Sequence, residues 1–293
     1  IKIILFSGTL VALYGIAEHF GIDKNVWVQD VQNRVFSTLG QPNWLAAYLD
    51  VLIFIVLTQI ITSSTPPKIH YSLLTIFYLC LLYTKSRSGF LGFIIPFLIF
   101  LTSQIIHSIR GEDNKLNKKL LSILGIILAI SLLIGIPFQL KGLRSKLTLS
   151  FLSDVQENTS PTTDRQSATT NRPRITPSSD IRKIVWKGAI ELWRRYPLFG
   201  TGVETFAYAY YWVRPKEHNF TSEWDFLYNK AHNEFLNFAA TTGTFGLLTY
   251  LILALTPIIY SIKKSQKNSP ITVHWPLATI LITNFFGFSV VPI

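Results

Sequence analysis

Long apolar runs alternate with short polar segments along most of the chain. Seven of these runs approach the roughly 20 residues that a helix needs to cross a hydrocarbon core about 30 Å thick. They lie at about residues 3–20, 43–61, 69–84, 89–106, 119–138, 244–262 and 273–293. The pattern predicts an all-α fold, a polytopic bundle of transmembrane helices in which Pro96, Pro137 and Pro257 kink or end their helices.

Positive charge in the short loops predicts the orientation of this bundle. Lys2, Lys68 and the clusters at 110–119 and 263–267 all fall on one side if the seven runs alternate across the membrane. That side is expected to be cytoplasmic, because Lys and Arg in short loops favour the cytoplasm. The loops 21–42, 85–88 and 139–243 are then expected to face outward.

Three parts make up the predicted organisation. Residues 1–138 hold about five spans, residues 139–243 form a large extracytoplasmic loop with catalytic helices, and residues 244–293 hold two further spans, the last truncated. Within the loop, residues 153–180 are rich in Ser, Thr and Pro and almost free of apolar side chains. Such a segment cannot bury enough apolar surface to fold, so it is expected to be disordered.

Order is expected to resume at Ser179, where a helix begins that Pro197 ends. Its apolar positions recur at helical spacing, at Ile181, Val185, Ala189, Leu192 and Tyr196. Two tryptophans flank this stripe and the segment carries five basic residues, so the helix is interpreted as one that could lie on the membrane surface.

Composition supports a membrane protein. The chain is 49% hydrophobic and only 15% charged, which is too apolar for an ordinary soluble domain of 293 residues. Its net charge of +11 would suggest nucleic acid in a soluble protein. Here the basic residues lie largely in loops beside apolar runs, so topology and anionic lipids explain them better, and no nucleic-acid partner is expected. Without methionine, and with apolar runs at both ends, the sequence is interpreted as an internal piece of a longer protein.

Familiar cofactor sites are missing from the pattern. The six histidines are scattered, without the paired spacing of a zinc or di-iron site, so neither a metal nor a cofactor is expected. Glycine-rich phosphate loops and the serine-hydrolase elbow are absent as well. Cys80 lies in an apolar run and is expected to be an inert packing residue.

Two arginines on the outward side are candidates for chemistry. Arg87, with Lys85, lies in a tight turn between two spans, where the pair could snorkel into the headgroups. The positive-inside tendency disfavours two cations in so short an outward turn, so an alternative is that Arg87 grips a phosphate. Arg182, in the first turn of the predicted surface helix, is either part of a solvated basic face or a second anion ligand.

His232 and Asp50 are the other polar candidates. His232 is expected to start a helix at the mouth of the sixth span, either as a cap or as a general base whose ordinary pKa suits proton transfer near neutral pH. A break at Gly243 is expected to separate this helix from the span. Asp50 occupies a costly position inside the second span and is expected either to pair with Lys85 or Arg87 or to face a hydrated vestibule.

Four stretches together resemble the O-antigen ligase and O-antigen polymerase family of bacterial membrane glycosyltransferases. They are LGQPNWLAAYL (39–49), YTKSRSGFLG (83–92), RKIVWKGAIELWRRYPLFGTGVETF (182–206) and AHNEFLNFAATTGTFGLLTYL (231–251). They are similar to the family's N-P-N-x-L-A segment, its S-R turn, its R-x-x-x-W helix with P-L-x-G-x-G, and its H-N-x-x-L motif. Each stretch alone is weak, and the likeness lies in their order and spacing.

The resemblance implies an enzyme of the bacterial inner membrane that transfers a glycan from a polyprenyl pyrophosphate donor to an acceptor hydroxyl on the extracytoplasmic face. It implies catalytic roles for Arg87, Arg182 and His232. The first two would also bind the donor, together with Lys85, Asn43 and Asn233. Leaving-group charge would be handled by arginine, without a metal, and attack would invert the anomeric centre.

The acceptor stays open at this point. A ligase-like transfer to lipid is expected first, and a polysaccharide polymerase or a protein O-oligosaccharyltransferase is the alternative. A transporter without glycosyl transfer is the alternative of another class. Transporters typically show internal repeats and charges near the midplane, whereas these candidates cluster at one interface.

Overall fold

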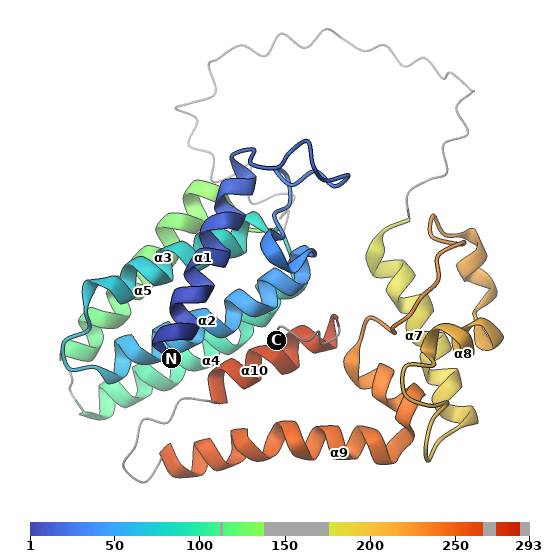
Figure 1. Ribbon diagram of the computed structural model, residues 1–293. Helices are drawn as coiled ribbons and strands as arrows, with labels where there is room; N and C mark the ends of the chain where they lie inside the picture. Colours follow the sequence, from blue (N-terminus) through green and yellow to red (C-terminus); the bar gives the residue numbers. More distant parts are fainter. Residues whose placement is uncertain (112–113, 138–175, 266–273, 288–293) are drawn as a thin grey trace, which may run out of the picture.

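A computed structural model describes residues 1–111, 114–137, 176–265 and 274–287 of the chain (Figure 1). Every long regular element in these ranges is an α-helix, as the apolar pattern predicts. Most of the segment 153–180, which was expected to be disordered, lies outside the described residues, as does the end of the last expected span at 288–293.

A helical bundle forms the membrane part. It comprises α1 (Lys2–His19), α2 (Pro42–Thr62), α3 (Lys68–Tyr83), α4 (Arg87–Gly111), α5 (Asn114–Ile134) and α10 (His274–Phe285). The helix α2 packs against all five others and carries the most buried side chains, among them Leu45, Leu49, Leu52, Ile53 and Phe54. The bundle is therefore organised around α2, whose start contributes to the site described below.

The seven expected spans all coincide with helices. Four helices in the described ranges, α2, α4, α5 and α9 (Glu234–Ser265), are long and apolar enough to cross a membrane. Pro96 lies inside α4 and Pro257 inside α9, while Pro137 follows the end of α5. Four of the seven expected spans are thus confirmed as helices long and apolar enough to cross a membrane.

A second helical part, which we call the α7 part, is built on α7 (Ser178–Arg195), which lies beside the beginning of α9 (Figure 1). Its apolar stripe is buried against α8 (Phe206–Val213) and the beginning of α9, at Ile181, Val185, Ala189 and Leu192. This stripe is covered by protein and is not free to insert into lipid. Tyr196, expected in the same stripe, is exposed because α7 ends at Arg195 before Pro197.

Two backbone segments, 197–202 and 240–245, join the α7 part to α9 through what we call the backbone clasp. Within α9 only Gly243 departs from helical geometry, with φ 67° and ψ −166°, which confirms the expected break there. The N–H groups of Thr201 and Gly202 donate to the carbonyls of Ala240 and Thr241, at 3.0 and 2.8 Å. These are carbonyls that a continuous helix would have used itself.

The clasp is reciprocal. On the far side of the break, the N–H of Thr244 donates to the carbonyl of Pro197 at 2.8 Å, and that of Phe245 to Leu198 at 3.3 Å. A Cβ atom on Gly243 would lie 2.3 Å from the carbonyl carbon of Leu198, and one on Gly200 would lie 2.3 Å from that of Thr241. Glycine is required at both positions, since the two backbones approach too closely for any side chain.

Gly243→Ala tests the clasp. The left-handed backbone alone costs roughly 1–2 kcal/mol for alanine, and overlap with Leu198 adds to that cost. We expect a lower unfolding temperature in detergent than for Gly40→Ala, a matched control with φ 74° but open space around its Cβ position. If the two variants melted together, the close backbone contact would not contribute to stability.

Candidate active site

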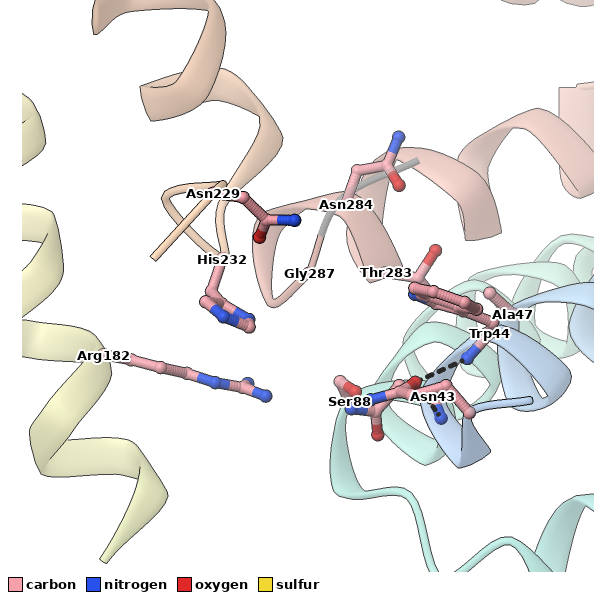
Figure 2. A pocket seen from close by; sticks show the side chains of 11 residues that line it. Asn43, Trp44, Ala47, Ser88, Arg182, Asn229, His232, Thr283, Asn284 and Gly287 are labelled. Atoms are coloured by element: carbon pink, nitrogen blue, oxygen red, sulfur yellow. Dashed lines mark hydrogen bonds between the residues drawn. The ribbon is translucent and has the colours of Figure 1, made fainter. Parts of the chain in front are cut away.

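A cavity of about 300 Å³ lies between the α7 part and the bundle (Figure 2). One wall comes from α7 and the loop before α9, and the other from the starts of α2 and α4 and the end of α10. Its lining residues are Gln41, Asn43, Trp44, Ala47, Ser88, Arg182, Asn229, His232, Thr283, Asn284 and Gly287. Of the residues expected to carry function, Asn43, Arg182 and His232 thus share one cavity.

His232 lies two residues before α9 and not inside a helix, which corrects the expectation that it starts one. Its backbone is left-handed, with φ 53°. The reason is the next residue: the Asn233 side chain accepts a hydrogen bond from the N–H of Leu236 at 3.0 Å and so takes the N-cap position. Asn237 reaches back to the N–H of Ala231 at 3.3 Å, which ties down both sides of His232.

The imidazole of His232 is held in an electropositive, partly buried environment. Burial, and then the positive charge of Arg182, lower the pKa of His232 to about 4. The ring of Tyr228 packs edge-on against it, with centroids 5.6 Å apart. At neutral pH the imidazole is therefore uncharged and can accept a proton from a group bound in the cavity, but it is a weaker base than the ordinary pKa expected from the sequence would make it.

Arg182 reaches into the same cavity from the first turns of α7, below His232 in Figure 2. Its guanidinium donates to the carbonyl of Phe286, just beyond α10, at 2.8 Å. Burial lowers the pKa of Arg182, and the nearby charge of Arg34 lowers it further, while Tyr228 and Glu223 act in the opposite direction. A half-buried guanidinium beside a second cation is an environment that favours an anionic ligand.

In the S-R turn, Ser88 lines the cavity, whereas Lys85, Ser86 and Arg87 lie beside it. Ser86 caps α4: its hydroxyl accepts from the N–H of Gly89 at 3.1 Å and donates to the side-chain oxygen of Asn43 at 2.7 Å. Arg87 begins α4 and is exposed. Lys85, also exposed, donates to the side chain of Asn33 at 2.6 Å.

Arg34 was missed by the sequence analysis. It lies in the loop between α1 and α2, where its guanidinium donates to the carbonyl of Thr84 at 3.3 Å. Burial and the charge of Arg87 lower the pKa of Arg34. Since Arg34 also acts on Arg182, it lies within electrostatic reach of both Arg87 and Arg182. The signal that could have found it is a cation in a loop expected to face outward, the same signal that singled out Arg87.

A buried carboxylate fixes the loop that carries Arg34. Glu18, at the end of α1, accepts hydrogen bonds from the N–H groups of Phe36 and Ser37, at 3.0 and 2.7 Å. Its relative exposure is 0%, so these bonds are made out of reach of solvent. The position of Arg34 thus depends on a contact between α1 and this loop, and no local sequence pattern predicts that contact.

Comparison with known proteins adds a family. The family model for O-antigen ligase matches residues 71–251, more than half of the chain. The chain belongs to the O-antigen ligase family. No curated protein matches it. The matched range includes Arg87, Arg182 and His232, while Arg34, Asn43 and α10 lie outside it.

Family membership makes this chain an enzyme of the broad glycosyltransferase kind, with glycan and lipid-linked substrates in general. The four long apolar helices fit an integral membrane protein. Both statements agree with the resemblance seen in the sequence.

In this O-antigen ligase family member, the wall opposite Arg182 is polar but uncharged. It presents Gln41, Asn43, Trp44, Ser88, Thr283 and Asn284, and no carboxylate occurs among the described residues that line the cavity. Amides, hydroxyls and an indole are groups that hydrogen-bond or stack on neutral polar ligands. Of these, the sequence analysis had named only Asn43, because α10 and the start of α2 become neighbours only through packing.

Asp50 lies below this wall, one turn after Ala47 on α2. Both carboxylate oxygens are buried without a hydrogen-bond partner among the described residues. A Cβ on Gly92 would lie 2.8 Å from one of them and 2.2 Å from the Thr283 methyl group, so Asp50 is enclosed between α4 and α10. The expected pairing with Lys85 or Arg87 is not made.

Among the described residues, no group of three or more His, Cys, Asp or Glu side chains could hold a metal ion.

Proposed function

We propose that the chain transfers a glycan from a polyprenyl pyrophosphate donor to an acceptor hydroxyl at the extracytoplasmic membrane face, with inversion and without a metal. The convergence of Arg182 and His232 on one cavity carries this proposal, because it brings an anion ligand and a neutral imidazole together (Figure 2). A ligase-like transfer is proposed first. A polysaccharide polymerase or a protein O-oligosaccharyltransferase, which differ in their acceptors, is the alternative.

The pyrophosphate is assigned to the arginines. Arg34 repels both Arg87 and Arg182, and a pyrophosphate bound at Arg182 would relieve part of that repulsion. Each contact at about 4 Å has a Coulomb term of order 4 kcal/mol at an effective dielectric of about 20, before desolvation. The same charges stabilise the pyrophosphate as it leaves, so they serve binding and catalysis together.

His232 is assigned the role of general base. Its neutral ring accepts the proton of the acceptor hydroxyl while the hydroxyl oxygen attacks the anomeric carbon. The bond from that carbon to the pyrophosphate oxygen breaks on the opposite face, and polyprenyl pyrophosphate departs with the electron pair. A bound pyrophosphate offsets the charge of Arg182, which is one of the two causes of the low pKa of His232. Donor binding should therefore make the base stronger.

The location is proposed from the same arrangement. The basic clusters at 110–119 and 263–267 are assigned to the cytoplasm. The catalytic residues then lie at the outer end of the spans, in the extracytoplasmic loop 139–243 between the spans of 1–138 and those of 244–293. The membrane is proposed to be the bacterial inner membrane.

His232→Gln and Arg182→Ala separate the two roles. We expect His232→Gln in the full chain to lower kcat by about 100-fold or more, as loss of a general base does, with little change in donor KM. Arg182→Ala should raise donor KM and lower kcat together. Glycan transfer from a polyprenyl pyrophosphate oligosaccharide measures both, with Arg194→Ala, an exposed arginine on the same helix, as the control. Normal transfer by His232→Gln would remove the base assignment.

The pH profile follows from the direction of the pKa shift. The catalytic form of His232 is neutral and is lost as pH falls through its pKa, which is about 4 in the free enzyme, below the ordinary 6.5. We expect kcat/KM to stay level from pH 8 to about 5, while kcat at saturating donor declines at a higher pH because the pyrophosphate raises the pKa. A kcat/KM that falls by half near pH 6.5 would contradict this environment for His232.

Metal removal tests the remaining part of the mechanism. Charge on the leaving pyrophosphate is assigned to guanidinium groups, so EDTA should leave the transfer rate unchanged. Inhibition by EDTA that a divalent cation reverses would overturn the metal-free proposal while leaving the family assignment intact.

A further inference from the structure

Tyr228 is a neighbour of both groups that the proposed mechanism uses, His232 and Arg182. It is buried, and its ring meets that of His232 edge-on with centroids 5.6 Å apart. The charge of Arg182 and the Tyr228 hydroxyl act on each other as well. A rigid ring in this place restricts the rotation of the His232 side chain, because the imidazole cannot turn without losing the contact.

The hydroxyl of Tyr228 is fixed by Glu223, to which it donates a hydrogen bond. Burial and the neighbouring carboxylate raise the pKa of Tyr228, so the hydroxyl keeps its proton and remains the donor. Its proton is thereby directed toward Glu223 and away from the cavity. Tyr228 acts as a fixed wall beside His232, not as a second acid.

Glu223 is anchored in turn by a buried histidine. His218 has 0% relative exposure, and its two ring nitrogens are 2.8 Å from the Tyr210 hydroxyl and 3.3 Å from the carbonyl of Glu223. Since a carbonyl can only accept, the ring donates to Glu223 and accepts from Tyr210. Burial and Arg214 lower the pKa of His218, which favours this neutral ring. The chain of contacts runs from α8 through His218 and Glu223 to Tyr228.

Glu223 also balances charge. Among the groups that act on Arg182, it is the carboxylate that favours the charged guanidinium, against burial and Arg34. Without Glu223, the positive charge of Arg182 would lie beside His232 with no offset from this carboxylate, and the pKa of His232 is already lowered. A carboxylate at this position offsets part of the field of Arg182, and Glu223 is not among the residues that line the cavity.

We infer that Tyr228 and Glu223 are positioning residues of the transfer reaction: Tyr228 fixes the plane of the His232 ring, and Glu223 holds Tyr228 and offsets the charge of Arg182. This inference rests on the proposed function, because it assigns the pair to the general base and the anion ligand named there. Neither residue touches the reacting atoms.

Three variants of the full chain in phospholipid vesicles test the inference, with a polyprenyl pyrophosphate oligosaccharide as donor. Tyr228→Leu removes the ring, and we expect kcat to fall by about 30-fold, since small misplacements of a catalytic group cost up to about 100-fold, while donor KM stays within about threefold. Tyr228→Phe keeps the ring and loses the bond to Glu223, so kcat should recover most of the loss. Tyr211→Leu, an exposed tyrosine on α8, is the matched control.

Glu223→Gln keeps the shape and removes the charge. The positive charge of Arg182 then acts on His232 without the offset from Glu223, so the pKa of His232 should fall. The acid limb of the kcat–pH profile should therefore move to lower pH. Loss of a residue with only a structural role would not move this limb. Glu217→Gln, an exposed carboxylate paired with Lys187, should leave the limb in place. Wild-type kinetics in Tyr228→Leu, or an unmoved limb in Glu223→Gln, would overturn the inference.

His232→Gln separates this inference from the proposed function. If that variant transfers glycan normally, the base assignment fails and the positioning roles fail with it. If it is inactive while Tyr228→Leu behaves as wild type, the proposed function stands and only the positioning roles are lost.

Discussion

The backbone clasp between 197–202 and 240–245 is the constraint on which the site depends. The clasp joins the C-terminal end of α7 to the break in α9 at Gly243. Arg182 lies near the other end of α7, and His232 lies two residues before α9. Backbone hydrogen bonds in both directions resist sliding as well as separation, and they are made between groups that the helix break at Gly243 sets free. The clasp thereby fixes the C-terminal end of α7 against the break in α9, and side-chain packing extends this contact along α7 to Ile181, next to Arg182.

The membrane helices could be predicted because an apolar run of the right length has few alternatives in a bilayer. The break at Gly243 was predictable for a related reason, since glycine is the residue that tolerates a positive φ. The prediction that Tyr196 belongs to the buried stripe of α7 was wrong, because helical spacing alone continues the stripe beyond the point where Pro197 ends the helix. The prediction that His232 starts a helix was wrong, because the next residue, Asn233, is the better N-cap.

The site was predictable only in part. Arg182 and His232 were found through a family likeness, and their shared cavity agrees with it. Arg34 was not found, because its placement requires Glu18 of another helix to hold the loop backbone. Thr283 and Asn284 were not found because they join Asn43 only when α10 packs on α2. When a residue reaches the site only through tertiary packing, the periodic pattern of the sequence does not show it.

The hydrogen bond from Arg182 to the carbonyl of Phe286 joins residues 104 positions apart in the chain. During synthesis the arginine and the histidine emerge long before the end of α10, so for that interval the cavity lacks the wall that Thr283 and Asn284 supply. A nascent chain therefore holds its charged groups without an enclosed site. Insertion of α10 supplies that wall, so the cavity is enclosed only after this helix has joined the bundle.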